Sequence, residues 1–207
     1  MAEAAERRPK AGRELDRIVN FSDAVFAIAI TILVLDIRMP DGVSPAELPA
    51  RVLALGPKYL SYVISFLVLA VYWQAHHGVF RPIRGYDGTL VWLNFLFLMA
   101  VAFLPFPTSL LGEYGNHQLP VAVYAATLAV GRLLLTAIQW YSVRHDRLLD
   151  EAQDPATVRF LLIRGLTIPA IYLLTIVISF FSVQAATWSW VILIVVDSVI
   201  LRIRLSH

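Results

Sequence analysis

The stretch RIVNFSDAVFAIAITILVLDI at residues 17–37 decides the fold of this chain. It joins a polar entrance, which contains Ser22 and Asp23, to an aliphatic run long enough to cross a bilayer, because a helix needs about 20 apolar residues to span about 30 Å of hydrocarbon. The polar segment 1–16 lacks the apolar core and cleavage site of a secretory signal peptide. We therefore expect residues 18–38 to form a retained membrane span.

The composition of the whole chain is that of a membrane protein. Of its 207 residues, 58% are hydrophobic and 15% are charged, and the mean hydropathy of +0.69 excludes a water-soluble globule. A net charge of +2 provides no basic surface for a nucleic acid. The absence of cysteine excludes disulfides and thiolate sites. No catalytic motif is present, so we predict neither an enzyme nor a bound metal or cofactor.

Six stretches are long and apolar enough to span a membrane, and we predict an all-α polytopic membrane protein whose residues 1–207 form one transmembrane domain. Pro105 and Pro107 in the third stretch, and Pro169 in the fifth, are expected to kink their helices. Between spans we expect a loop and short interfacial helix at 39–56 and a solvated linker at 144–157. The predicted helices are 18–38, 57–79, 89–112, 119–142, 158–182 and 186–203.

The distribution of Lys and Arg predicts the orientation, because cytoplasmic loops are enriched in these residues. Most of the 17 flank one side of the predicted spans, which indicates that segment 1–16 and both termini are cytoplasmic in a plasma membrane. The residues on this side are Arg7, Arg8, Lys10, Arg13, Arg17, Arg81, Arg84, Arg144, Arg147, Arg159, Arg202 and Arg204, whereas Arg38, Arg51 and Lys58 flank the other side.

Four charged residues fall within the predicted spans, where an unpaired charge is costly. They are Asp23, Arg132, Arg164 and Asp197. Asp23 requires a donor inside the protein, and Arg164 lies at a similar depth, so we expect a buried polar layer in the inner half of the membrane. Such a layer either holds helices together or relays protons or ions.

One face of the first helix is aliphatic. At about 100° per residue, Ala24, Ile28, Thr31, Ile32 and Leu35 share one arc of the helix surface. Periodicity alone does not distinguish a lipid-facing stripe, a core stripe and a pore lining.

The polar entrance resembles the R-x-x-x-F-S-D signature of the lysosomal potassium channel family, transmembrane protein 175, in its prokaryotic branch. Arg17, Phe21, Ser22 and Asp23 fill the signature. The resemblance extends through the first three helices, in the segments WQAHH at 73–77, WLN at 92–94 and FLPFPT at 103–108. The last three predicted helices agree with the family only in number, length and hydropathy.

This resemblance implies a homotetramer in which four first helices surround a pore that conducts potassium passively. It places the constricting hydrophobic layers at Ile28, Ile32 and Leu35, with the Thr31 hydroxyl alongside, so that the same rings act as filter and gate. It also implies that Trp73, His77 and Asn94 brace the signature of the first helix. A monovalent cation is the only ligand expected, and the bilayer and three further copies are the expected partners.

Several alternatives remain open at the level of sequence. A secondary ion transporter would use the buried charges, although that class usually contains internal repeats, and a membrane scaffold would carry no flux. Asp36 either attracts cations at the outer mouth or pairs with Arg38 or Lys58. His76 and His77 point about 100° apart, which disfavours a shared ligand, and a titrating histidine would make opening depend on pH.

Overall fold

The computed structural model describes residues 2–145, 148–149, 154–186 and 188–190, and the elements within them are helical. Most of the predicted sixth span, 186–203, lies outside the described residues. The elements are α1 (Ala2–Ile32), the 3-10 helix η1 (Leu33–Asp36), α2 (Leu48–Ala54), α3 (Gly56–Phe80), α4 (Gly88–Phe103), α5 (Pro105–Tyr114), α6 (Gln118–Arg144) and α7 (Pro155–Ser179).

Within the described residues, five stretches are long and apolar enough to cross a membrane, and they agree with the first five predicted spans to within a few residues at each end. The predicted short helix after the first span is present as α2. The five stretches are Arg13–Asp36, Gly56–Phe80, Gly88–Tyr114, Gln118–Arg144 and Pro155–Ser179.

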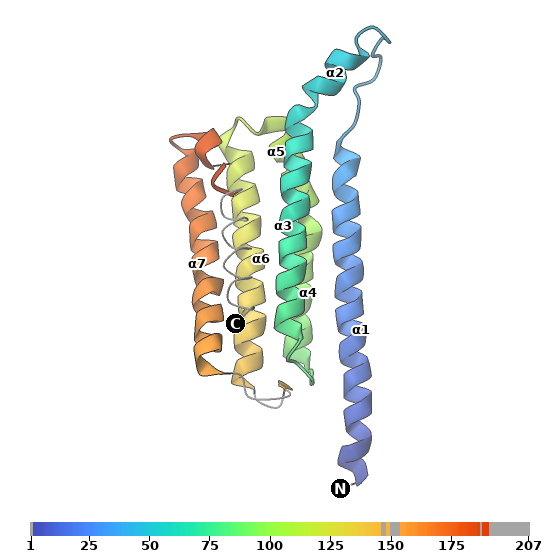
Figure 1. The fold of residues 1–207 in the computed structure, drawn as a ribbon, viewed down its shortest axis with the longest axis vertical. Coiled ribbons are helices and arrows are strands. Elements are labelled where there is room, and N and C mark those ends of the chain that lie inside the picture. Colours follow the sequence, from blue (N-terminus) through green and yellow to red (C-terminus); the bar gives the residue numbers. More distant parts are fainter. Residues whose placement is uncertain (1, 146–147, 150–153, 187, 191–207) are drawn as a thin grey trace.

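The spans form an antiparallel bundle with α1 at one edge and α7 at the other (Figure 1). α1 packs on α3 and α4, while α6 packs on both α4 and α7. The start of α1 and the connections after α3 and α6 lie at one end of the bundle, and α2 lies at the opposite end. The segments that carry most of the Lys and Arg residues therefore share one end.

The expected proline kink in the third span is present as a break: the span Gly88–Tyr114 agrees with the predicted 89–112 but consists of two helices. α4 ends at Phe103 and α5 begins at Pro105, because a proline has no N–H and its ring collides with the preceding turn. Thr108 instead connects α5 to α3 just after the break: its Oγ1 lies 2.8 Å from the Leu104 carbonyl oxygen and 2.8 Å from Ser65 Oγ of α3.

The proline within α7 is accommodated by its neighbour α6. Pro169 cannot donate to the carbonyl of Gly165, four residues earlier. The Thr136 hydroxyl of α6 lies 3.0 Å from that carbonyl oxygen and 2.8 Å from the Arg132 carbonyl oxygen of its own helix, and its one proton serves either of them. The helices are in close contact here, since a Cβ on Gly165 would lie 2.4 Å from Thr136 Oγ1. The neighbouring helix thus places a hydroxyl within hydrogen-bond distance of the backbone group that the proline frees.

The linker after α6 is partly packed against the bundle. The backbone N–H groups of Arg84 and Gly85 donate to the Leu148 carbonyl at 2.8 and 3.1 Å, and Ile83 forms an antiparallel bridge with Leu149. The Leu148 side chain is buried. The prediction of a solvated linker is therefore wrong for Leu148, because its apolar side chain packs under the α3–α4 connection.

Candidate functional site

The first membrane helix has one buried and one exposed face. The side chains of Leu15, Ser22, Phe26, Ala29 and Leu33 recur at helical spacing and are buried against the bundle. The predicted aliphatic stripe lies on the other side: Ile28 is 58% exposed, Ile32 43% and Leu35 56%. Ala24 and Thr31 are exposed as well, and the Thr31 hydroxyl donates to the Ile28 carbonyl at 2.9 Å. A single chain therefore leaves this stripe uncovered.

The last turn of this helix changes its geometry. Residues Leu33–Asp36 form the 3-10 helix η1, in which side chains three residues apart eclipse one another. Ile32 is the last residue of α1 and Leu35 lies in the 3-10 turn, where the rise is about 2.0 Å per residue. Leu35 stays exposed like Ile28 and Ile32, and the sequence offers no signal for the 3-10 turn.

A directed chain of hydrogen bonds fixes the buried face. Ser22 Oγ donates to the Ile18 carbonyl at 2.9 Å and accepts from Asn94 Nδ2 of α4 at 3.0 Å. The Asn94 oxygen lies 2.9 Å from His76 Nε2 of α3. Since that amide oxygen only accepts, Nε2 of His76 carries the proton. The chain therefore ties α1, α4 and α3 together.

His76 is the member of this chain that the sequence analysis did not place among the bracing residues. Its ring is fully buried and lies 4.4 Å from Phe80 and 5.4 Å from Phe97, measured between ring centroids. Its Nδ1 is buried and makes no hydrogen bond. His77, which the family resemblance placed among the bracing residues, is more exposed and lies near Asp23 rather than in this chain of hydrogen bonds. Selecting between the two histidines requires the rotation of α3, which only packing determines.

Asp23 is bound by a second contact between α1 and α3. Trp73 Nε1 donates to Asp23 Oδ1 at 2.8 Å, and His77 Nδ1 lies 4.0 Å from the same oxygen. The Trp73 and His77 rings lie one helical turn apart, with centroids separated by 5.1 Å. The donor expected inside the protein is therefore an indole N–H.

Asp23 and Arg164, which we expected at similar depth in a buried polar layer, do not lie on neighbouring helices. Arg164 lies on α7, at the opposite edge of the bundle from α1 (Figure 1). Arg132 lies on α6, between those edges. The sequence indicates how deep a residue lies along its helix, and by that measure these residues are at similar levels. It does not indicate which helices are neighbours. Asp197 lies outside the described residues.

The first two residues of the signature are not part of the bracing chain. Arg17 is exposed, and its Nη1 pairs with Glu14 one turn earlier on α1 at 2.9 Å. Phe21 is also exposed and contacts Phe95 of α4 edge to face, with ring centroids 5.8 Å apart. The signature thus divides into an inward half, Ser22 and Asp23, and an outward half.

Asp36 forms neither of the salt bridges considered from the sequence. Its Oδ1 accepts from Ser109 Oγ of α5 at 2.6 Å. Lys58 pairs with Glu113 at 3.1 Å, and Arg38 Nε donates to the Leu35 carbonyl at 2.8 Å. The nearby hydroxyl and the alternative partners of the two cations determine this arrangement.

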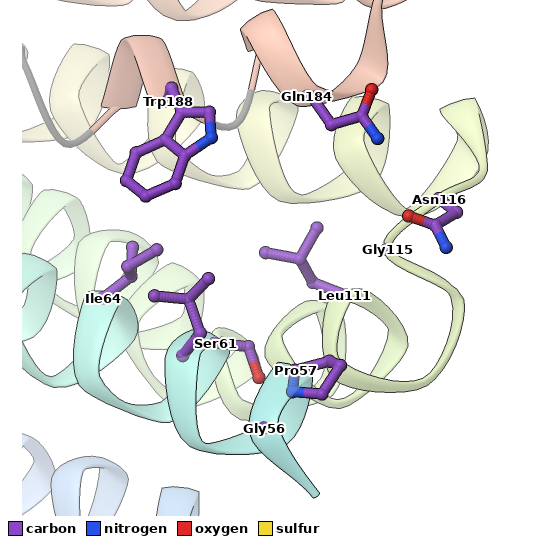
Figure 2. Close-up of a pocket in the computed structure, with 10 residues that line it drawn as sticks. Gly56, Pro57, Ser61, Ile64, Leu111, Gly115, Asn116, Gln184 and Trp188 are labelled. Atoms are coloured by element: carbon purple, nitrogen blue, oxygen red, sulfur yellow. The ribbon is translucent and has the colours of Figure 1, made fainter. Parts of the chain in front are cut away.

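A pocket of about 290 Å³ lies at the end of the bundle where α2 joins α3 (Figure 1). Figure 2 shows Ser61 and Ile64 of α3 on one side of it and Gln184 and Trp188 on the other. None of the described residues that line it belongs to α1. This pocket is therefore separate from the aliphatic stripe.

The fold and this site together define a class: a polytopic helical membrane protein whose first span is braced by polar contacts on one face and exposes an aliphatic stripe on the other. The sequence model of the family described as endosomal/lysosomal potassium channel TMEM175 matches residues 17–105.

Two bacterial relatives extend the match beyond these helices. A potassium channel of Streptomyces collinus is 38% identical over 173 residues, covering 82% of this chain and 84% of the relative. A potassium channel of Chamaesiphon minutus is 38% identical over 190 residues, covering 88% of this chain and 90% of the relative. The chain belongs to the TMEM175 family. The prediction of its prokaryotic branch is confirmed, and these relatives are channels rather than enzymes.

A solved structure agrees with this fold. The crystal structure of a lysosomal potassium-selective channel TMEM175 homologue from Chamaesiphon minutus superimposes with a TM-score of 0.80. It is 32% identical, and the alignment covers 90% of this chain and 97% of that chain.

Proposed function

We propose that this protein is a potassium channel that conducts passively through a pore lined by α1. The observation that carries the proposal is the exposed stripe of Ile28, Ile32 and Leu35 on a helix whose opposite face is fixed by hydrogen bonds. These contacts fix the rotation of α1, which a pore lining requires. Potassium as the permeant ion is supported by the names of both bacterial relatives.

Four copies of the chain form the conducting unit in this proposal. One chain contributes one stripe, and one stripe cannot enclose a path, so further copies have to complete it. In a fourfold assembly each of the three aliphatic positions becomes a ring, and Thr31 adds a hydroxyl between the rings of Ile28 and Leu35. This arrangement accounts for the high exposure of the stripe in the single chain.

The hydrophobic rings serve as both filter and gate. An ion that enters a narrow aliphatic ring loses water and gains no replacement ligand, so the ring discriminates by the cost of dehydration. Potassium holds its water less tightly than sodium, which favours potassium to a moderate degree. The same ring empties of water when it narrows and then blocks all ions.

The bracing residues act on the rings indirectly. Asn94 and Trp73 hold Ser22 and Asp23 from two different helices, which fixes both the rotation and the height of α1. A rotation of α1 by one residue, about 100°, would replace an aliphatic ring by another set of side chains. Orientation follows the Lys and Arg distribution, with the start of α1 in the cytoplasm of a bacterial cell.

Flux measurements on reconstituted protein test this proposal. Purified protein in potassium-loaded liposomes is expected to release potassium down its gradient without saturation and without coupling to a second ion. Saturable flux coupled to protons or sodium would instead establish a transporter, and no flux beyond that of protein-free liposomes would establish a scaffold. The mass of the detergent-solubilised assembly, measured in parallel by light scattering, is expected to equal four chains.

A further inference from the structure

A cluster of polar side chains holds the outer end of α1 to the rest of the bundle. Ser109 Oγ of α5 donates to Asp36 Oδ1 at 2.6 Å. Lys58 Nζ of α3 donates to the Asp36 backbone carbonyl at 3.4 Å and to Glu113 Oε1 of α5 at 3.1 Å. Asp36 thus receives a hydrogen bond on its side chain from one helix and on its backbone from another.

The cluster satisfies carbonyl groups that every helix end leaves without partners. The Val34 carbonyl accepts from the Ile37 N–H at 3.1 Å, and the Leu35 carbonyl accepts from Arg38 Nε at 2.8 Å. The Asp36 carbonyl accepts from the Arg38 N–H at 2.9 Å as well as from Lys58. Each donor fixes one step of η1, and Lys58 is the only one of them on another helix.

The surroundings indicate that this cluster is built into the packing. The Lys58 side chain is only 20% exposed. A Cβ on Gly112 of α5 would lie 2.8 Å from Ser61 Oγ and 3.4 Å from Lys58 Cγ, so α5 approaches α3 closely at this level. Hydrogen bonds to charged groups in such partly buried places are shorter and stronger than neutral ones.

We propose that Ser109 and Lys58 are positioning residues that hold η1 through Asp36 and thereby set the width of the Leu35 ring. The proposal rests on the proposed function, because it requires Leu35 to line the ion path. It also assigns the Asp36 carboxylate to holding the helix rather than to attracting cations. Replacing Asp36 by Asn keeps an acceptor for Ser109, whereas replacing it by Ala removes that acceptor.

The chain contains no cysteine, so a Leu35→Cys variant carries a single reactive thiol per chain. Its modification by a charged thiol reagent, followed as a change of current in planar bilayers, reports whether position 35 borders the ion path and how accessible it is. We expect Ser109→Ala in this background to change the modification rate by at least about threefold. Ser109→Thr, which retains the hydroxyl, is expected to restore the original rate.

The permeability ratio of potassium to sodium provides the second readout, measured in the natural Leu35 background on assemblies that elute as intact oligomers. We expect Ser109→Ala and Asp36→Ala to change the ratio in the same direction, while Asp36→Asn and Ser109→Thr remain near the natural protein. If Ser109 and Asp36 only stabilised the fold, their replacement would lower the yield of oligomer, and the oligomers that still form would keep the natural permeability ratio.

Three results would overturn the inference, each in a distinguishable way. Currents of Leu35→Cys that do not respond to the reagent would remove Leu35 from the ion path and contradict the proposed function itself. Currents that respond, with equal modification rates and permeability ratios for Ser109, Ser109→Ala and Ser109→Thr, would leave the channel intact and refute the positioning role. If Asp36→Asn lowered the conductance while the Ser109 variants did not, Asp36 would act as a charge that attracts cations.

Discussion

Asn94 of α4 donates its side-chain N–H to the hydroxyl of Ser22 on α1 across 3.0 Å, and both side chains are buried. The direction of this bond fixes the amide, because Ser22 has already given its proton to the Ile18 carbonyl. The amide oxygen then faces His76 Nε2. One side chain thus joins two helices to α1, and its removal leaves His76 Nε2 without a partner and Ser22 Oγ without its donor.

Replacing Asn94 by Leu is expected to lower the stability of the folded chain by about 1–2 kcal/mol, since Ser22 and His76 lose a partner in a medium that offers no water. Thermal unfolding in detergent measures the loss. Gln74→Leu makes a similar change at an exposed site on α3, and we expect it to have no effect. Equal melting temperatures for the two variants would contradict the bracing role of Asn94.

The Trp73 and Asp23 contact is expected to behave as a coupled pair. Trp73→Phe removes the indole N–H that donates to Asp23 at 2.8 Å and is expected to cost about 1–2 kcal/mol. Asp23→Ala is expected to lower the yield of the tetramer. Adding Trp73→Phe to Asp23→Ala is expected to cost much less than Trp73→Phe alone, because the acceptor is already gone. Additive losses in this double-mutant cycle would show that the bond carries no energy of its own.

The five described spans and the proline breaks were accessible from the sequence because both depend on local properties. Hydropathy and length locate a span, and a proline lacks the N–H that its helix requires. The pairing of Asp23 was not accessible in the same way. Depth along a helix suggested Arg164, but the donor is Trp73, because the order in which helices pack around α1 depends on the whole bundle.

The same limit applies to His76, η1 and Asp36. His76 and His77 are adjacent and chemically identical, and only the rotation of α3 separates a buried ring from an exposed one. No local signal marks Leu33–Asp36 for a 3-10 turn. The bond from Ser109 to Asp36 joins residues separated by 73 positions, so a sequence offers the nearby Arg38 more readily than the actual partner.

The contact between α6 and α7 predicts a site-specific cost for a single methyl group. Gly165→Ala places a Cβ 2.4 Å from Thr136 Oγ1, and we expect a loss of about 1–3 kcal/mol from overpacking. Gly78→Ala is the matched control, because a Cβ at that helical position meets nothing within 4 Å, and it is expected to be neutral or slightly stabilising. Thermal unfolding that ranks the two variants equally would contradict the close approach.

The start of α7 is expected to respond to acid. Asp154 caps this helix, and the backbone N–H of Thr157 lowers the pKa of its carboxyl below the ordinary value of 3.8. Because the folded pKa lies below the unfolded one, the contribution to stability is present above pH 3.8 and is lost as the pH falls through the folded pKa. Asp154→Asn keeps an acceptor without the charge. We therefore expect the melting temperature of the natural protein to decrease relative to that of Asp154→Asn once the pH is lower than 3.8. A difference in melting temperature that stays constant with pH would contradict the assignment.

The aliphatic stripe yields the most direct test of the pore. Ile28→Asn makes a ring of amides in the proposed assembly, which holds water where isoleucine excludes it. We expect the single-channel conductance to rise severalfold and the preference for potassium over sodium to decrease, as measured from reversal potentials in planar bilayers.

Ile163→Asn is the control for this experiment, because Ile163 is 54% exposed, close to the 58% of Ile28, but lies on α7 at the far edge of the bundle. The same substitution at that site is expected to leave both conductance and permeability ratio unchanged, since a polar side chain there meets lipid or headgroups rather than ions. If Ile163→Asn changed the permeability ratio as much as Ile28→Asn, or if neither did, then Ile28 would not border the ion path.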